Sequence, residues 1–542
     1  MIILGISGGH DANWCVVRDG VLLGAFEKER FTRRRHDSGE VVSLIEPTLR
    51  FLGIERSDID VVATSEPVHH GTDAGHRRIG GSKYKSPDEW QHQVVDCLGR
   101  VLPCVSVPHH LAHAAYARYT SGFDNTAVIT WDGGGDFYTE DAYSSTTVSS
   151  WRQGKLEWLQ RLDNSDLGSL WFLYSRAIFG DGNAAGKLMG LAAYGTDRMV
   201  DALSDRFLAP VRGTFEGAWT IKNCWPDYYY PPFLREGAVD WQAPAAKDIA
   251  FGVQALTNLS GLSIAAKARQ VTGYNHLAIS GGVALNGYLN TAIRLSGEFE
   301  EVFVPPAVND GGIAAGCALF AAHHVFELPW PCATPGPLEF NGMAYGAEQV
   351  DAALFRAGLS GRRVDAEAAE ECVADALRRN RVVAWYEGRS EHGPRALGHR
   401  SILSLPSSDE ARDHLNRKIK FREPFRPVAP VVLENEAADY FDLDWASPYM
   451  MYIVKAKGRT ATYAPAAVHV DKTSRVQTVG EDCSLGRIVK RVGELTGTGI
   501  VLNTSFNVKT AIVETPQDAV ETFAQVPIDM LYIDGVLVER QG

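Results

Sequence analysis

Residues 2–26 read IILGISGGHDANWCVVRDGVLLGAF and decide the fold of the first part of the chain. An apolar run precedes a turn rich in glycine, and two further apolar runs flank Asp19-Gly20, a dipeptide typical of type I′ hairpins. The pattern returns at 126–145, TAVITWDGGGDFYTEDAYSS, as an apolar run, a glycine turn and a second strand. This weak repeat predicts a duplicated α/β domain, with a nucleotide between the halves and its phosphates on the turn amides.

The rest of the chain predicts a second α/β domain. Strand–glycine turn–helix units occur at 277–293 and 302–322, and a stretch rich in proline and glycine at 328–342 ends the first domain. A helix over 365–380 and the strand RVVAWYEG begin the second domain. We therefore predict domains over 1–345 and 360–542, as expected for 542 residues, a chain too long for one ordinary core.

Composition and charge exclude some functional classes. The net charge of −13 and the lack of a basic tract argue against nucleic acid as a partner. The eight cysteines are scattered without a CxxC pair, which predicts thiols in a reducing, cytoplasmic compartment. The uncharged stretch 274–293 is long enough for a bilayer, but its asparagines and glycines favour a soluble strand-and-helix unit, so no membrane partner is expected.

A histidine pair in PHHLAHAAY (108–116) predicts a metal site. His109 and His113 are four residues apart among good helix formers, which stacks them on one helix face. The alternative is a pair of surface or core histidines. Asp132 and Asp310 each follow an apolar strand, although aspartate also forms turns and helix caps. Two histidines with two aspartates suit iron(II), zinc or manganese.

Glycine turns offer backbone N–H groups without an obstructing Cβ. DGGGD (132–136) and SGGVALNG (280–287) are of this kind, with a tight hairpin as the alternative for each. GDGNAAGKLMG (180–190) resembles a P-loop, but Leu188 stands where serine or threonine should hold magnesium. We therefore exclude a Walker ATPase.

Two basic stretches predict an anion pocket. They are GRSEHGPRALGHRSIL (388–403) and NRKIKFREPFRP (416–427), in which Gly-Pro and Glu-Pro fix the backbone between guanidinium groups. The alternative is a solvated basic face paired with nearby glutamates. VLNTSFNV (501–508) adds a strand ending in amides and hydroxyls, suited to a planar polar group or an adenine edge. The cations concerned are Arg389, Arg395, Arg400, Lys418, Lys420, Arg422 and Arg426.

An aromatic loop, WPDYYYPPF (225–233), is either a packed domain seam or the entrance for an acceptor. Flat apolar faces with phenol hydroxyls at the rim suit a sugar or a glycosylated macrolide. An aminoglycoside would require several carboxylates, and this loop has only Asp227. The second alternative predicts a neutral or weakly polar hydroxylated natural product.

These segments together resemble the carbamoyltransferase family that includes the NodU nodulation and CmcH cephamycin enzymes and the tobramycin carbamoyltransferase. The resemblance rests on stretches that span the chain in family order. They are ILGISGGHDAN, ERFTRRRHD, HHLAHAA, WDGGGD, GKLMGLAAYG, SGGVALN, NDGG, GPRALGHRSI, FREPFRPVAP and LNTSFN. It implies an α/β protein with an N-terminal Kae1-like domain of the actin/sugar-kinase/Hsp70 superfamily, with two duplicated subdomains, and a C-terminal YrdC-like α/β domain.

The resemblance also implies an ATP-dependent carbamoyltransferase (EC 2.1.3.-). The YrdC-like domain makes carbamoyl adenylate from carbamoyl phosphate and ATP, releasing pyrophosphate and phosphate. The Kae1-like domain passes the carbamoyl group to a hydroxyl of a natural-product acceptor, as in antibiotic or macrolide/glycoside tailoring. Bound Fe²⁺, or another divalent metal, assists the transfer, and Mg²⁺ accompanies ATP.

Site residues follow from the same motifs. The metal ligands are His109, His113, Asp132 and Asp310, and His10 is a general base beside Asp11. The residues for nucleotide and carbamoyl phosphate are Arg34, Arg35, Asp132, Gly133, Gly134, Gly281, Gly282, Asn286, Arg395, Lys420, Arg426, Arg475, Asn503 and Asn507. The sequence departs from the family pattern at Lys509-Thr510-Ala511, where glycine-glutamate-proline is usual, and at His392 and His399.

Three other classes stay open. They are a small-molecule kinase of the same superfamily, an enzyme that makes threonylcarbamoyl adenosine in tRNA, and a non-catalytic nucleotide sensor. Carbamoyl phosphate-dependent release of pyrophosphate from ATP separates them from the carbamoyltransferase. The sequence leaves open which acceptor hydroxyl is used and whether the protein is a monomer or a homodimer.

Overall fold

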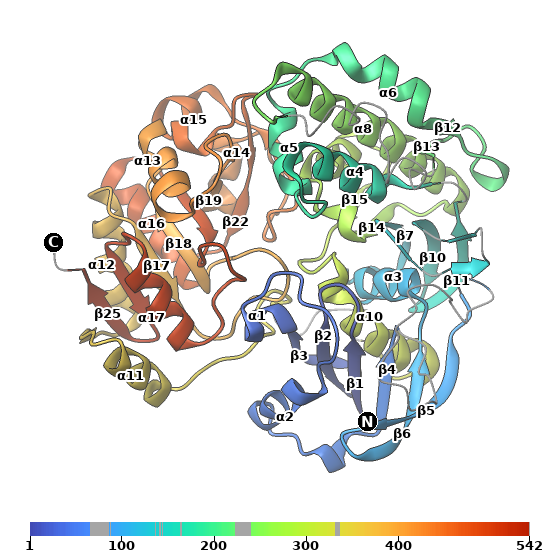
Figure 1. Ribbon diagram of the computed structural model, residues 1–542, viewed down its shortest axis with the longest axis horizontal. Coiled ribbons are helices and arrows are strands. Elements are labelled where there is room, and N and C mark those ends of the chain that lie inside the picture. The colour runs from blue at the N-terminus through green and yellow to red at the C-terminus, as the bar shows by residue number, and fades with distance from the viewer. Residues whose placement is uncertain are drawn as a thin grey trace. The chain divides into compact units, whose positions relative to one another are not determined.

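The protein is described by a computed structural model that covers residues 1–65, 86, 88–135, 137–139, 142–143, 145–162, 165–222, 240–330 and 337–540. These residues form a mixed α/β fold (Figure 1). The chain divides into two compact units: the first is Met1–Lys28 with His36–Leu338, and the second is Glu29–Arg35 with Glu339–Gly542. The predicted domain ranges were contiguous, whereas residues 29–35 pack with the second unit because their arginines bind it.

The first unit contains two sheets with matching strand orders. In the first sheet, of order β3-β2-β1-β4-β6-β5, an antiparallel meander of three strands is followed by the parallel strands β4 and β6, and β5 pairs antiparallel with β6 at the edge. Its strands are β1 (Ile2–Ser7), β2 (Asn13–Arg18), β3 (Val21–Glu27), β4 (Val61–Thr64), β5 (Gln91–Cys97) and β6 (Arg100–Ser106). Asp19 and Gly20 have φ angles of 51° and 84°, which confirms the predicted type I′ hairpin.

The second sheet repeats this plan in the order β11-β10-β7-β14-β15. Its strands are β7 (Asn125–Trp131), β10 (Thr146–Arg152), β11 (Lys155–Arg161), β14 (His276–Ser280) and β15 (Glu301–Phe303). An antiparallel meander is again followed by parallel strands, so the predicted duplication is confirmed in topology. The second long strand begins at Thr146, later than the 126–145 pattern predicts, because the turn after β7 contains a short ribbon of β8 (Phe137–Thr139) and β9 (Ala142–Tyr143).

Two helices form the centre of the first unit. α3 (His109–Thr120) packs against α10 (Ile313–Phe320), and α10 also packs on β1 and β2. Gly316 makes the close approach possible, since a Cβ at this position would lie 1.9 Å from the carbonyl oxygen of Ala112. The remaining α-helices of the first unit are α2 (Val42–Phe51), α4 (Leu167–Phe179), α5 (Ala185–Ala192), α6 (Val200–Phe207), α8 (Pro244–Thr272) and α9 (Gly287–Leu295), and its other strands are β12 (Leu208–Pro210) and β13 (Trp219–Ile221).

Helix α8 is, among the described residues, the one helix long and apolar enough to cross a membrane by length and composition. In its most apolar stretch, 61% of the residues are buried, and the helix packs against α5, α6 and α9 of its own unit. That burial is typical of a core helix of a globular domain. The uncharged stretch 274–293 forms β14, a turn and α9, as predicted.

The second unit is built on one mixed sheet, in the order β16-β25-β24-β17-β18-β23-β19-β22. Its strands are β16 (Arg362–Arg363), β17 (Val383–Tyr386), β18 (Arg400–Ser404), β19 (Ala429–Leu433), β22 (Gln477–Val479), β23 (Val501–Ser505), β24 (Met530–Ile533) and β25 (Val536–Glu539), with a separate ribbon of β20 (Ile453–Lys455) and β21 (Thr473–Arg475). α1 (Lys28–Thr32) joins this unit from residue 29 onward. The other α-helices are α11 (Ala347–Arg356), α12 (Ala366–Arg378), α13 (Asp409–His414), α14 (Ala437–Tyr440), α15 (Gly458–Tyr463), α16 (Ser484–Thr496) and α17 (Pro516–Gln525).

The helix and strand predicted at the start of the second domain are confirmed as α12 and β17. Asp365 caps α12 by accepting a hydrogen bond from the N–H of Ala368 at 2.8 Å. α12 and α16 pack together over the sheet, where Val373, Val383 and Ile488 are fully buried.

Candidate active site

The predicted metal ligands meet in the first unit. One ligand atom from each of His109, His113, Asp132 and Asp310 lies within 4.8 Å of all the others. His109 Nε2 lies 3.0 Å from Asp132 Oδ2 and 3.7 Å from Asp310 Oδ1, and His113 Nε2 lies 3.7 and 3.3 Å from the same two atoms. Two imidazole nitrogens and two carboxylates thus converge on one point.

Local structure explains the convergence. α3 begins at His109, so both histidines lie on its first turns, and Asp132 directly follows β7. Asp310 begins a 3-10 turn, Asp310–Gly312, that leads into α10. Gly281 has a φ of 89°, and a Cβ there would lie 2.1 Å from the carbonyl oxygen of Trp131. Glycine at 281 therefore lets the chain pass close to the end of β7.

The turn after Gly281 holds Asp132 in place. The N–H of Gly282 donates to Asp132 Oδ1 at 3.0 Å, which leaves Oδ2 facing the histidines. Such an outer hydrogen bond orients a metal-binding carboxylate. The glycine-rich turn predicts that the N–H of Gly282 donates a hydrogen bond to a phosphate. In the structure this N–H donates to Asp132 instead.

The donor set fits a divalent metal. His113 Nε2 is buried without a hydrogen-bond partner among the described residues, although it faces two carboxylates at 3.3 and 3.7 Å. Burial lowers the pKa of His113, yet the neighbouring carboxylates of Asp132 and Asp310 raise it above its ordinary value. Burial also opposes ionisation of Asp132, but the two imidazoles hold its pKa well below the usual range. A cation shared by these groups would satisfy all of them.

Asp11 joins two histidines beside this cluster. Its carboxylate lies 2.8 Å from His36 Nδ1 and 3.2 Å from His10 Nδ1, and it accepts a hydrogen bond from Asn309 Nδ2 at 2.9 Å. The rings of His10 and His36 stack with centroids 4.9 Å apart. The hydrogen bond to Asp11, opposed by burial, raises the pKa of His10 to about 9. His10 is therefore mostly an imidazolium at neutral pH.

Sequence reasoning selected His10 and Asp11 and missed their partners. His36 lies in the TRRRHD stretch and Asn309 precedes the predicted ligand Asp310, so both are next to residues that the sequence singles out. The signal available was the residue type, since an amide and an imidazole are common partners of a buried carboxylate. Asp11 is 6% exposed and has a φ of 53°, a left-handed conformation that these contacts maintain.

The second unit gathers cations from distant parts of the chain. We call Arg395, Lys420, Arg422, Arg426 and Arg475 the basic cluster. Burial, followed by the charges of the other members, lowers the pKa of Arg422 to about 9 and that of Arg475 to about 10. In the described part of the chain, one carboxylate forms an ion pair with the cluster, Glu423 Oε2 at 4.0 Å from Arg426 Nη1. The cluster therefore carries uncompensated positive charge, in a protein of net charge −13.

Lys420 shows how the cluster is built. It follows the turn Leu415–Ile419, and its ammonium donates to the carbonyl oxygens of Ser505 and Asn507, both at 2.7 Å, and to the Ser505 hydroxyl at 3.2 Å. Asn507 Oδ1 accepts a further bond at 2.5 Å. All these acceptors are neutral, and burial, with the charges of nearby arginines, lowers the pKa of Lys420 well below its ordinary value. A phosphate or carboxylate ligand would supply the missing negative charge.

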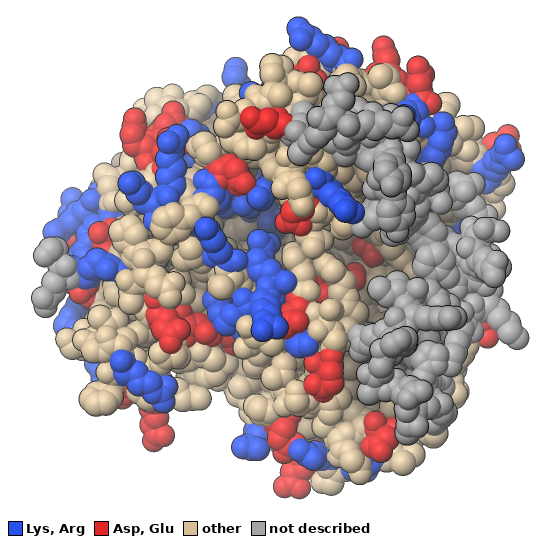
Figure 2. Space-filling model, in the orientation of Figure 1, with Lys and Arg blue, Asp and Glu red and all other residues tan. Residues whose placement is uncertain are grey.

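Lysine and arginine side chains gather into a blue patch on the face drawn in Figure 2, whereas acidic side chains are spread in small groups. Within the basic cluster, Arg395 Nε and Arg475 Nε are buried without a hydrogen-bond partner among the described residues. Burial, then the charges of Arg475, Arg426 and Arg35, lowers the pKa of Arg395 well below its ordinary value. Guanidinium groups whose buried N–H lacks a hydrogen-bond partner favour an anionic ligand.

Other predicted residues have structural partners. Asn286 caps α9 by accepting from the N–H of Leu289 at 3.0 Å, and its amide also pairs with Gln254. Asn503 Nδ2 donates to the Ala396 carbonyl at 3.1 Å and to Gln477 Oε1 at 2.9 Å. Asn503 thereby fixes the chain next to Arg395, which is a positioning contact.

The remaining predicted residues are the glycines after Asp132, two arginines and the aromatic loop. Gly133 accepts a hydrogen bond from the Ser169 hydroxyl at 3.2 Å, and Gly134 accepts one from His110 at 2.9 Å. Arg34 and Arg35 are exposed. The aromatic loop 225–233 lies outside the described residues, so the prediction of an acceptor entrance there stays a prediction.

The departures from the family pattern have local explanations. His399 stacks on Phe340 with ring centroids 3.5 Å apart, and His392 is 2% exposed, with its N–H bonded to the Glu339 carbonyl at 2.7 Å. Thr510 and Ala511 bind Arg33.

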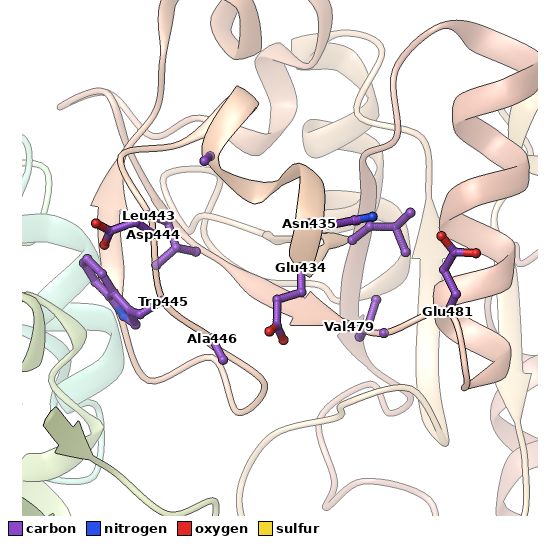
Figure 3. Close-up of a pocket in the computed structure, with 11 residues that line it drawn as sticks. Glu434, Asn435, Leu443, Asp444, Trp445, Ala446, Val479 and Glu481 are labelled. Carbon is purple, nitrogen blue, oxygen red and sulfur yellow. The ribbon is translucent and has the colours of Figure 1, made fainter.

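A separate pocket of about 630 Å³ lies in the second unit, at the ends of β19 and β22. Figure 3 shows Glu434 between Trp445 on one side and Val479 on the other, with Asp444 and Glu481 farther out. Its carboxylates repel anions such as carbamoyl phosphate and ATP. This pocket is therefore not the predicted anion site.

Comparisons with known proteins agree with the sequence motifs. The models for the carbamoyltransferase N-terminus and C-terminus match residues 71–319 and 374–540. An uncharacterized protein of Synechocystis sp. is 30% identical over 99% of this chain and 96% of its own. Nodulation protein NolNO of Sinorhizobium fredii is 30% identical over 100% of this chain and 83% of its own, and Nodulation protein U of the same species is 29% identical over 94% of both.

The chain belongs to the carbamoyltransferase family, which confirms the resemblance identified from the sequence. Among solved structures, full-length HypF in its phosphate- and nucleotide-bound form matches with a TM-score of 0.34 and 16% identity, over 61% of this chain and 56% of that chain. This likeness is too low to bear on function.

Proposed function

We propose that the protein forms carbamoyl adenylate at the basic cluster and transfers its carbamoyl group to an acceptor hydroxyl beside the histidine–aspartate cluster. Family membership supports carbamoyl transfer. The observation that carries the finer proposal is the basic cluster, whose partly or fully buried cations have, among the described residues, neutral hydrogen-bond acceptors and one carboxylate partner at 4.0 Å. Carbamoyl phosphate and ATP are both anionic, and their union needs such a site.

Formation of carbamoyl adenylate has two parts. Carbamoyl phosphate and one water give carbamate and phosphate, and a carbamate oxygen then attacks the α-phosphorus of ATP to give carbamoyl adenylate and pyrophosphate. Lys420 and the arginines of the cluster neutralise the two anions as they approach, and Mg²⁺ accompanies ATP. Asn507, which holds the Lys420 ammonium, keeps that point charge fixed.

In the second step the acceptor oxygen attacks the carbamoyl carbon of the adenylate, AMP leaves, and His10 is the base. Its Nδ1 faces Asp11 at 3.2 Å, so Nε2 is the nitrogen that takes the proton from the acceptor hydroxyl. His10 acts as the base in its neutral form, and its hydrogen bond to Asp11, which raises its pKa, orients the ring. His109, His113, Asp132 and Asp310 would hold Fe²⁺ or another divalent metal, which supplies Lewis-acid polarisation of a carbonyl when bound.

We assign the two units to the two domain types that the sequence predicts. The repeated strand order of the first unit supports a Kae1-like domain of the actin/sugar-kinase/Hsp70 superfamily, and the second unit is then the YrdC-like domain. The acceptor is a small hydroxylated natural product, and the site of action is the cytoplasm, as the sequence predicts.

Division of labour between the units tests this function. Arg395→Ala removes a cation of the basic cluster and should abolish adenylate formation, a loss of roughly 2–5 kcal/mol for a buried charge contact. His10→Ala should leave adenylate formation intact and block transfer. Synthetic carbamoyl adenylate should restore product with Arg395→Ala and not with His10→Ala. The reverse pattern of rescue would show that the two steps are assigned to the wrong units.

A further inference from the structure

Residues Glu29–Arg35, which we call the basic strap, pack with the second unit, although the residues on both sides belong to the first. Before the strap, the N–H of Lys28 donates to the Ala12 carbonyl at 2.8 Å. After it, His36 binds Asp11, and Asp37 accepts from the N–H of Ala12 at 2.9 Å. The residues that flank the strap are thus bonded, within the first unit, to the loop that carries His10 and Asp11.

Arg30 and Arg33 fix the strap on the second unit. Arg30 is 2% exposed and donates from Nη2 to the Gly393 carbonyl at 2.7 Å. Arg33 donates to the Thr510 hydroxyl at 3.0 Å and to the Ile512 carbonyl, and its Nε lies 3.4 Å from Asp518 Oδ1. Arg33 has a φ of 62°, a conformation that a non-glycine residue keeps only where its contacts determine it.

A chain of hydrogen bonds leads from Arg33 to the basic cluster. The Thr510 hydroxyl accepts from Arg33, and the Thr510 carbonyl accepts from Asn507 Nδ2 at 2.5 Å. Asn507 in turn accepts from the Lys420 ammonium through its carbonyl and its Oδ1. Moving the 510–512 turn would therefore move the amide that holds Lys420.

The strap also contributes a charge. Arg35 is close enough to Arg395, Lys420 and Arg426 that its charge opposes protonation of each. Arg35 lies between two residues with fixed partners: Arg33, which is bonded to the 510–512 turn, and His36, which is bonded to Asp11. The contact of Arg33 with the 510–512 turn thus lies near both a hydrogen-bond acceptor of Lys420 and a sixth cation.

We propose that Arg33 is a positioning residue for the anion site: its guanidinium fork holds the 510–512 turn and so sets Asn507 against Lys420 and Arg35 beside the basic cluster. The inference rests on the proposed function for the identity of the reaction and on the contacts above for the geometry. Arg33→Lys would keep the positive charge but lose the guanidinium fork. This variant therefore tests whether the fork, and not the charge alone, holds the turn.

Four variants test the proposal. Arg33→Lys removes the guanidinium fork, Thr510→Val removes the hydroxyl that accepts from Arg33, and Thr510→Ser keeps that hydroxyl. Arg491→Lys is the matched control, because Arg491 is an exposed arginine paired with Glu371 and Glu494 in the same unit. Pyrophosphate affinity is measured by calorimetry, carbamoyl phosphate-dependent exchange of pyrophosphate into ATP by isotope transfer, and folding by thermal unfolding.

We expect Arg33→Lys and Thr510→Val to weaken pyrophosphate binding and to slow exchange by about tenfold or more, with unfolding temperatures close to wild type. Thr510→Ser and Arg491→Lys should remain within about twofold of wild type. Unchanged pyrophosphate affinity in both Arg33→Lys and Thr510→Val would overturn the proposal, and so would losses that merely follow lowered unfolding temperatures. If wild type binds pyrophosphate in an Arg33-dependent manner but shows no exchange, the proposed reaction is wrong and the positioning role stands.

Discussion

Arg475 offers a test in which stability and binding should move in opposite directions. It ends β21, its Nε is buried without a hydrogen-bond partner among the described residues, and burial, then the charge of Arg426, lowers its pKa from 12.5 to about 10. One pKa unit corresponds to 1.36 kcal/mol, so this difference of 2.5 amounts to about 3 kcal/mol against the charged form in the folded state. Arg475 is partly exposed, and solvent screening reduces that figure to roughly 1–3 kcal/mol.

The sign of the effect follows from the direction of the shift. The unfolded chain binds the Arg475 proton more tightly than the folded protein, so the cost is fully present below pH 10 and is relieved as the pH rises from 10 to 12.5. Arg475→Met keeps much of the side-chain volume and removes the charge. At pH 7.5 we therefore expect the variant to be more stable than wild type by about 1–3 kcal/mol.

The same variant should lose its ligand. Saturating pyrophosphate at about 100 times Kd should stabilise wild type by about 2.7 kcal/mol, and the variant should lose most of this gain. Denaturant unfolding with and without pyrophosphate measures both effects, and Arg491→Met serves as an exposed control. A variant that is less stable than wild type and still stabilised by pyrophosphate would refute the view that the cluster is an anion site held at a cost in stability.

Two further predictions concern the first unit. Purified wild type should contain about one divalent metal per chain and His113→Ala much less, because His113 is a fully buried member of the proposed ligand set. Elemental analysis measures the metal content, and the exposed His92→Ala is the control. Equal metal content in all three proteins would eliminate the site. In metal-free protein His10 should titrate near pH 9, with its ion pair to Asp11 present below that pH and lost above it. Asp11→Asn should bring the pKa of His10 back toward 6.5, and NMR titration measures both values. A wild-type His10 pKa near 6.5 would contradict the Asp11 contact.

Local sequence patterns predicted the parts of the fold that depend on local forces. Asp19-Gly20 forms the hairpin because both residues tolerate positive φ. His109 and His113 share a helix face because the spacing itself specifies it. Asp132 lies at a strand end because an apolar run precedes it. These features needed no knowledge of the tertiary structure.

Residues whose partners are distant in sequence could not be placed in this way. The TRRRHD stretch has three adjacent arginines of equal local character, and only the folded chain distinguishes Arg33, which binds Thr510, from the exposed Arg34. Similarly, the glycine turn at 280–287 predicted free amides, whereas Gly282 binds Asp132, 150 residues away in sequence. Family motifs identified the neighbourhood of each contact, and the tertiary structure assigned the partner.

The central claim is that carbamoyl phosphate and ATP react to give an adenylate. Its most direct test is to incubate the metal-loaded wild-type protein with ATP, Mg²⁺ and carbamoyl phosphate and to measure pyrophosphate and AMP. The account predicts that pyrophosphate appears only when both substrates are present. Formation of ADP from ATP with a hydroxylated acceptor, independent of carbamoyl phosphate and without pyrophosphate, would contradict it and would indicate a kinase.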